Sequence, residues 1–366
     1  MNWLNRNFNK LDRYIAGKFI KTFLVTIFLF VVIIIIFDVA EKLDDFLKRN
    51  APIDEIITVY YVSFIPTLIN TFSPIFIFIS VLYLTSRLAS RSEIISMLAG
   101  GMSLVRIFRP FMVVGAFMAW GSYMLNAWII PITDKQRVKF ENTYLRDYWS
   151  EARSAIYRQI KPGVVMYMEY FSNHDSTGIG VTVEEYKGIE LKSSMFGRFI
   201  RWDRQAKKWR LEMVTMREFL PNGNQKVQNL PYLDTNIGFN PQNFFFRVED
   251  VQSLNQSELR GFIVKEQERG SPNVNGLNSE LYRRYASPFS TFILIAIGVS
   301  VAGRKTRGGL GISLGIGIFV ILFFLFFSKY FISLGATGVL PSQIAVWLPN
   351  VIFIPVAWLF YWKAQK

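Results

Sequence analysis

The distribution of apolar residues constrains this chain more than any other feature of its sequence. Residues 23–37 read FLVTIFLFVVIIIIF, and the apolar stretch extends from residue 22 to residue 40 with Asp38 near its end. A run of about 18 or more apolar residues is typical of a transmembrane helix. The charged segment DVAEKLDDF follows and no small-residue cleavage site is present, so we interpret the run as a membrane span and not as a signal peptide.

Five more apolar stretches follow, and they lie on both sides of a long polar middle region. They cover about residues 57–85, 107–130, 285–302, 310–334 and 343–362. The sequence therefore predicts an α-helical polytopic membrane protein with six transmembrane helices, three before and three after the middle region. The second span contains Pro66 and Pro74; both would kink it, and neighbouring helices could satisfy the freed carbonyl groups.

The short loops differ in their content of Lys and Arg, and this difference predicts the orientation. The N-terminal tail, the loop between spans two and three, the loop GRKTRGG and the C-terminus together hold 14 basic residues. The short loops on the other side hold only Lys42, Lys48 and Arg49 among several acids. By the positive-inside rule, both termini are cytoplasmic and the middle region lies outside. The formal net charge of +14 thus mainly records membrane orientation and does not indicate nucleic-acid binding.

The middle region, residues 131–284, has the pattern of a folded domain. Residues 164–171, 178–186 and 209–219 alternate between apolar and polar side chains, as half-buried strands do, and the turn clusters SNHDSTG, DRQAKK and PNGN separate such stretches. We expect an antiparallel sandwich or a jelly-roll-like sheet. Near its end, Asn255 and Glu258 have capping-box spacing before a short helix that stops at Gly270.

Composition and motif spacing argue against an enzyme. The chain has no cysteine and one histidine, His174, which excludes thiol nucleophiles, Cys-ligated zinc and paired-imidazole metal sites. His174 lies beside Asp175 in a turn-rich stretch, and a surface histidine explains it better than a catalytic one. The segment from Gly298 to Thr306 misses the phosphate-loop spacing by one residue and follows a membrane helix where that loop needs a strand. We assign no catalytic and no metal-binding residues.

The loop of residues 87–105 has a more informative pattern. It predicts a short amphipathic helix over residues 92–98, which the pair Gly100–Gly101 ends, with the single acid Glu93 among several arginines. One interpretation is an interfacial helix whose arginines contact lipid headgroups. The other is a docking helix that inserts into a cytoplasmic partner, with Glu93 pairing to an arginine of that partner. Composition alone favours neither.

Charged residues inside or at the boundary of the spans form a second candidate feature. Asp38, Glu41 and Lys42 end span one, and Lys329 lies within span five. Charges at such depth are costly and often mark a ligand pathway or a partner. For Lys329, the alternatives are snorkelling towards the nearby membrane surface and contact with an anionic ligand in the outer leaflet.

Four motifs, in this order and with this layout, resemble the LptF/LptG family of lipopolysaccharide export permeases. They are LDRYI (residues 11–15), SRLASRSEIISMLAGGMS (86–103), YRRYASPFSTFILIAIGVSVAGRKTRGG (282–309) and LPSQIAVWLPN (340–350). The resemblance covers essentially the whole chain. Its opening motif is more similar to the LptG side of the family. The middle region matches loosely, through pieces such as the strand at residues 209–211.

The resemblance implies a domain plan and a set of partners. Residues 1–130 would hold helices 1–3 with a coupling helix at about 88–105, residues 131–284 an inserted periplasmic β-jellyroll-like domain, and residues 285–366 helices 4–6. The chain would pair with a paralogous LptF or LptG subunit in the bacterial inner membrane and bind a cytoplasmic LptB-like ATPase dimer. It would extract lipopolysaccharide and pass it to LptC- and LptA-like periplasmic jellyroll proteins. ATP would bind to the ATPase, and this chain would hold no cofactor.

The resemblance also implies roles for particular residues. Glu93 matches the acid of the family's coupling helix, which favours docking over lipid contact. Lys42 lies near the position of the family's basic residues at the outer end of span one, and Lys329 is a second candidate for contact with the lipid. The proposed ATPase-coupling set consists of Arg91, Glu93, Ile94, Met97 and Leu98.

Three other functional classes compete with export, and the third, a membrane enzyme, would need a pair of acids in an outer-face cavity, which the sequence does not place. A membrane-anchored structural or sensor protein would use the outer domain as a passive binding module and would place the short cytoplasmic helix against lipid. A permease of another ATP-driven exporter, for lipids or lipoproteins, is the second alternative. Families of that kind that resemble this one have four spans with the outer domain between the first two, and the six-span layout argues against them.

Overall fold

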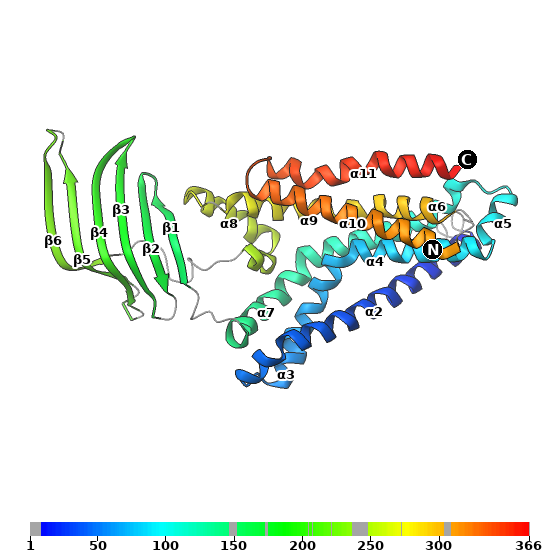
Figure 1. The fold of residues 1–366 in the computed structure, drawn as a ribbon, viewed down its shortest axis with the longest axis horizontal. Helices are drawn as coiled ribbons and strands as arrows, with labels where there is room; N and C mark the ends of the chain where they lie inside the picture. Colours follow the sequence, from blue (N-terminus) through cyan, green and yellow to red (C-terminus); the bar gives the residue numbers. More distant parts are fainter. Residues whose placement is uncertain are drawn as a thin grey trace. The chain divides into compact units, whose positions relative to one another are not determined.

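The computed structural model describes residues 9–145, 152–172, 175–203, 205–206, 208–220, 222–235, 248–271, 273–303 and 309–365. The chain forms two compact units. The first, here called the helical unit, comprises Met1–Phe140, Gln252–Gln256 and Asn275–Lys366. The second, the sheet unit, comprises Glu141–Val251 and Ser257–Val274. Figure 1 shows the elements of both units.

The helical unit contains the six predicted spans. In its first half, α2 (Lys10–Lys48) is followed by α3 (Ile53–Glu55), η1 (Ile56–Tyr61) and α4 (Val62–Ser90), then α5 (Glu93–Ala99), α6 (Leu104–Met124), η2 (Leu125–Ile129) and α7 (Ile130–Tyr144). The second half consists of α9 (Val274–Ala302), α10 (Gly309–Ala336) and α11 (Ser342–Gln365). Six helical stretches in the described residues are long and apolar enough to cross a membrane. The prediction of six membrane-spanning helices around an inserted sheet is confirmed.

Several helices continue well beyond their apolar stretches. Helix α2 has 39 residues and is therefore about 58 Å long at 1.5 Å per residue, against about 30 Å for the hydrocarbon core of a bilayer. The backbone N–H of Asn9 donates to Asp12 Oδ2 at 3.0 Å, which satisfies one donor at the start of the helix. Pro66 and Pro74 both lie inside the continuous helix α4.

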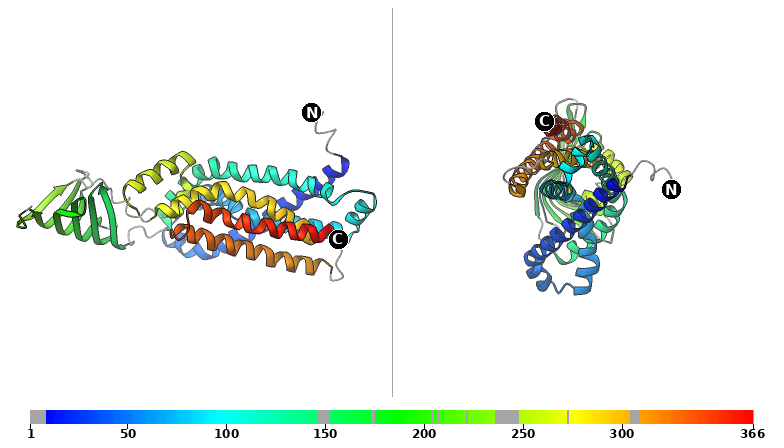
Figure 2. Two further views of the ribbon diagram at one scale, coloured as in Figure 1. Left: turned by 90° about the horizontal axis from the view of Figure 1, so that it is seen from above. Right: turned by 90° about the vertical axis from the view of Figure 1, so that its right-hand side faces the viewer.

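Two apolar clusters hold the helical unit together; α9, α10 and α11 lie side by side, and α2 is inclined to them (Figure 2). One cluster joins α2, α4, α5, α6 and α9 and includes Ile15, Phe19 and Ile94. The other joins α4, α9, α10 and α11 around Phe324 and Phe353. The spans differ in how far this chain covers them. In the most apolar 18-residue stretch of each span, 56% of the residues are buried in the second span and 6% in the first.

The sheet unit is built on six antiparallel strands. They are β1 (Ala152–Lys161), β2 (Val164–Ser172), β3 (Thr177–Lys187), β4 (Glu190–Asp203), β5 (Lys208–Phe219) and β6 (Gln225–Thr235). They pair in sequence order from β1 to β6, so the described strands form one continuous meander and show no second sheet. The core of the sheet unit lies on one face, where Ile200 pairs with Leu211 and Trp202 with Trp209.

The strand and helix predictions in this region are confirmed where they were made. The alternating stretches became β2, β3 and β5, and the short helix after Asn255 is α8 (Gln256–Glu268). Gly270 follows it with φ +60°, as a helix-ending glycine does. Strands β1, β4 and β6 had no explicit prediction. Leu259 and Ile263 of α8 are buried.

Candidate coupling and lipid-contact sites

Helix α5 is a separate short helix between spans two and three, as the sequence predicted. Ser92 precedes it in a left-handed conformation with φ +63°, which a non-glycine residue adopts at a cost. This residue ends the run of α4 and turns the chain into α5. Gly100 caps the other end, and Gly101 has φ +84°. Figure 1 shows α5 at the same end of the helical unit as the start of α2 and the end of α11.

The side chains of α5 divide into a buried and an exposed set. Ile94 is buried and belongs to the cluster that contains Ile15 and Phe19, and Met97 packs against the same cluster. Ile95 and Leu98 are exposed, at 46% and 40%, and Arg91 is exposed as well. Of the proposed coupling residues, Ile94 therefore anchors the helix to its own chain. Ile95, absent from that set, is the exposed apolar neighbour of Leu98.

The carboxylate of Glu93 contacts helix α2. Tyr14 Oη donates a hydrogen bond to Glu93 Oε2 at 2.9 Å, and Lys18 Nζ lies 3.5 Å from the same oxygen. Lys18 also donates to the hydroxyl of Tyr14 and lies 4.0 Å from the centre of its ring. Three side chains from two elements, 79 residues apart in sequence, thus form one polar cluster.

A second contact joins α2 to the start of α6. Arg106 Nη2 donates to Asp12 Oδ2 at 2.7 Å, and the side chain of Asp12 is 1% exposed. The backbone N–H of Arg106 in turn donates a hydrogen bond to Ser103 Oγ at 3.3 Å. A buried carboxylate is stable only with a compensating cation. Since Arg106 on α6 supplies that cation to Asp12 on α2, the ion pair holds this end of α2 against α6.

Lys42, one of the two candidate lipid contacts, lies in a closed network at the opposite end of α2. Its ammonium group donates to Asp38 and to the hydroxyl of Tyr60. Tyr60 and Tyr61 both donate to Asp38 Oδ2 at 3.1 Å. The Lys42 ammonium also lies 5.6 Å from the ring centre of Phe64, within reach of a cation–π interaction. The charge of Lys42 is therefore compensated within the chain.

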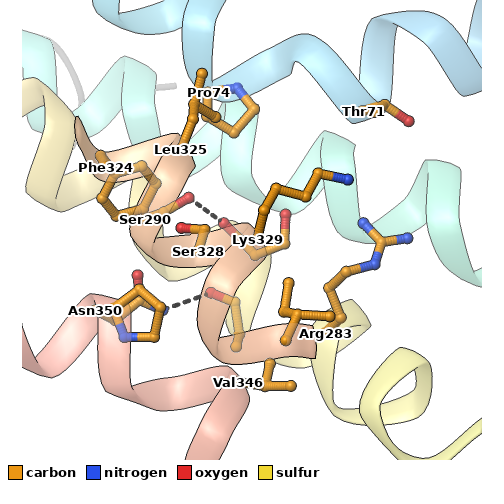
Figure 3. A pocket seen from close by; sticks show the side chains of 14 residues that line it. Thr71, Pro74, Arg283, Ser290, Phe324, Leu325, Ser328, Lys329, Val346 and Asn350 are labelled. Atoms are coloured by element: carbon orange, nitrogen blue, oxygen red, sulfur yellow. Dashed lines mark hydrogen bonds between the residues drawn. The ribbon is translucent and has the colours of Figure 1, made fainter. Parts of the chain in front are cut away.

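Lys329, the other candidate, lines a cavity of about 120 Å³ between α4, α9, α10 and α11. In Figure 3, its ammonium group and the guanidinium group of Arg283 extend to the same side of the cavity. The lining residues include these two cations and no acid. Within the described part of the chain, the Lys329 ammonium has no hydrogen-bond or ion-pair partner.

Arg283 belongs to a charged triad on α9 that the sequence analysis did not identify. It forms a bidentate pair with Glu280, with distances of 2.7 Å and 2.8 Å. Arg284 Nε lies 3.5 Å from Glu280 Oε1, and Arg284 Nη1 donates to the carbonyl of Leu254 at 2.8 Å. The triad could have been predicted from the sequence, because its three charges stand at i, i+3 and i+4 at the start of an apolar span.

The remaining sequence motifs have structural explanations or lie outside the described residues. Gly298, at the start of the segment that resembles a phosphate loop, lies inside α9, where a Cβ atom would stand 2.9 Å from Val81 Cγ1. Close helix packing explains this glycine. His174 and residues 304–308, which include three basic side chains, lie outside the described residues. Among the described residues, no group of three or more His, Asp or Glu side chains is placed to hold a metal ion.

Comparison with known proteins identifies the family. The comparison with curated proteins gave no match. The family model described as lipopolysaccharide export system permease LptF/LptG matches residues 13–363, which include all six spans and the inserted sheet. That description covers both subunits, so the preference for LptG stays a prediction. With nearly the whole chain matched, the protein belongs to the LptF/LptG family of lipopolysaccharide export permeases.

Proposed function

We propose that this chain is one half of an ATP-driven permease in the bacterial inner membrane, with both termini in the cytoplasm. A paralogous subunit would complete the permease, and a separate LptB-like ATPase dimer would drive it. The complex would extract lipopolysaccharide from the outer leaflet and pass it to LptC- and LptA-like jellyroll proteins. An energy source is needed because a multi-chain lipid that leaves the bilayer exposes apolar surface, at about 25 cal/mol per Å².

The observation that carries this proposal is the geometry of α5. The helix is tied to its own core by Ile94 and leaves Ile95 and Leu98 exposed, with Glu93 at its first position. An acid at a helix start beside two exposed apolar side chains fits a pocket that offers apolar walls and a basic residue. An ATPase that closes on α5 would move α4 and α6, to which α5 is directly connected in the chain.

The ATPase partnership is tested by capture of the ATPase from cells. The tagged chain is co-expressed with its paralogue and the ATPase and then purified in detergent. We expect the ATPase to copurify with the wild type and to be lost with Glu93→Arg, because reversed charge would repel a basic residue of the partner. Glu190→Arg reverses an exposed acid of the sheet unit and serves as the matched control. Failure of the wild type to retain the ATPase would contradict the proposal.

The cavity beside Lys329 is the proposed contact for a phosphate of the lipid. The Lys329 ammonium makes no ion pair within the described residues, and no acid lines the cavity, so the site favours an anion; Arg283 beside it is already paired with Glu280. A volume of about 120 Å³ exceeds the share of a single water molecule, about 30 Å³, and is far below the 300–1,000 Å³ of pockets that enclose drug-sized ligands. The site therefore fits one anionic group of a headgroup, while the acyl chains would remain outside the cavity.

A pair of substitutions tests this contact. Lys329→Met should reduce photo-crosslinking of lipopolysaccharide to a probe in α10 by about tenfold, the size expected for a lost charge-assisted hydrogen bond. Lys329→Arg keeps the charge and should retain most of the crosslinking. Equal crosslinking for the wild type and Lys329→Met would remove the cavity from the lipid pathway.

A further inference from the structure

The first three turns of α2 contact both ends of the segment that connects spans two and three. Tyr14 and Lys18 contact Glu93, at the beginning of this segment. Asp12 contacts Arg106, just after its end. Side chains at positions 12, 14 and 18 thus bracket α5, while Ile15 on the inner face of α2 packs into the same cluster as Ile94.

The two oxygens of the Glu93 carboxylate are used differently. Both contacts from α2 are made to Oε2. Within the described residues, Oε1 accepts no hydrogen bond, and the side chain is 25% exposed. A carboxylate accepts hydrogen bonds on both oxygens. Glu93 is therefore held through one oxygen and retains the other for a donor from outside the chain.

We propose that Tyr14 and Lys18 are positioning residues of the coupling helix: they orient Glu93 towards the ATPase and transmit a displacement of α5 into α2. The inference rests on the proposed docking of α5 and adds the route by which that docking reaches span one. Tyr14 is the central member, because its hydroxyl accepts from Lys18 and donates to Glu93. The phenol thereby fixes the direction of the carboxylate.

The packing of α2 makes it suitable for such a transmission. Only 6% of its most apolar 18-residue stretch is buried in this chain, whereas 56% of the corresponding stretch in the second span is buried. Along this stretch α2 still contacts α4, through Thr26 with Ser80 and Phe30 with Phe76, so a displacement of α2 would reach α4 as well. The helix is held beside α5 by the buried Asp12 and Ile15 and near its other end by the network of Asp38 and Lys42.

The experiment measures lipopolysaccharide released per ATP hydrolysed by the complete complex in liposomes. Tyr14→Phe should lower this ratio by about tenfold, the size expected for losing one hydrogen bond to a charged group. Lys18→Met removes the cation 3.5 Å from the same oxygen and should lower the ratio as well. Lys18→Arg keeps the cation and should restore the ratio. Lys21→Met is the matched control, because Lys21 is an exposed lysine of the same helix with no partner among the described residues.

A Glu93→Ala background, which removes the acceptor of the Tyr14 hydroxyl, separates positioning from a general structural role. If Tyr14 and Lys18 act through the Glu93 carboxylate, Tyr14→Phe and Lys18→Met should have no further effect in that background. Equal losses with and without the carboxylate would overturn the inference, as would a loss of the same size for Lys21→Met. A wild-type complex that retains no ATPase would instead overturn the proposed function, and the inference with it.

Discussion

The two ends of helix α2 carry charged clusters of similar composition. They differ in whether both oxygens of the central carboxylate accept hydrogen bonds. At the η1 end, Asp38 accepts from Lys42, Tyr60 and Tyr61 with both of its oxygens. At the α5 end, the contacts to Glu93 all fall on Oε2. The first cluster is closed and the second is open. A boundary charge therefore indicates a ligand or a partner only when the surrounding chain leaves part of it unsatisfied.

The same comparison separates the two lysines that the sequence analysis treated alike. Lys42 has an acid four residues before it on its own helix and aromatic rings around it. Within the described residues, Lys329 makes no ion pair and no cation–π contact, and it lines a cavity without acids. We therefore propose Lys329 as the lipid contact in preference to Lys42, for which the structure provides a stabilising role.

The largest effect on stability is expected at the α5 end of α2. Arg106→Met leaves the carboxylate of Asp12, which is 1% exposed, without its cation, and should lower the free energy of unfolding by about 3 kcal/mol. Thermal unfolding in detergent measures this loss. Arg109→Met, a neighbouring arginine with no partner among the described residues, should change the midpoint little. Equal losses for the two would show that the Asp12 pair does not hold this end of the helix.

A smaller effect is expected from the closed cluster. Lys42→Met should cost about 2 kcal/mol, because Asp38 keeps its two tyrosine donors. The double variant Asp38→Asn/Lys42→Met should recover part of that loss, since no unpaired charge remains. A double-mutant cycle in thermal unfolding gives the coupling. If Lys42→Met leaves stability unchanged and lowers lipid crosslinking as much as Lys329→Met, the distinction between the two lysines is wrong.

The smallest effect is expected from an ion pair on the surface of the sheet unit. The bidentate pair with Arg210, at 2.8 Å and 3.1 Å, lowers the pKa of Asp234 below its ordinary value through hydrogen bonding and charge. A lowered carboxyl pKa stabilises the fold above the ordinary pKa of aspartate, and this contribution is lost as the pH falls through the lowered value. Arg210→Met should raise that pKa, as measured by carboxyl ¹³C titration, and leave the unfolding midpoint at pH 7 nearly unchanged, because water screens both groups. A clear drop in that midpoint would mean that surface ion pairs contribute as much to stability as the charged clusters on α2.

The architecture was largely predictable because hydrophobicity alone determines which segments enter a membrane. The six spans and α5 follow from apolar runs and a Gly100–Gly101 stop. Their bounds were less predictable: α7 continues span three to Tyr144 through charged sequence that has helical propensity but no apolar signal. Strand β6 was missed because its side chains are mostly exposed, so it lacks the alternation that identified β2.

The candidate sites were predictable only as single residues. Glu93 was identified from its position, and the motif LDRYI only from its resemblance to the family. The structure gives that motif a physical basis, since Asp12 pairs with Arg106, Tyr14 contacts Glu93, and Ile15 enters the core. Pairings across 79 and 94 residues leave no periodic trace in one sequence, which is why the partners of Glu93 and Asp12 were not predicted.

The sequential order of the six strands has a consequence for the biogenesis of the protein. Each strand pairs only with its neighbours in the sequence, so the ladder grows hairpin by hairpin and needs no strand residue beyond Thr235. Local pairing of this kind forms quickly, and domains begin to fold from the N-terminal side during synthesis. The sheet should therefore be assembled before α9 leaves the ribosome, and the last three helices would then insert beside a domain that has already folded.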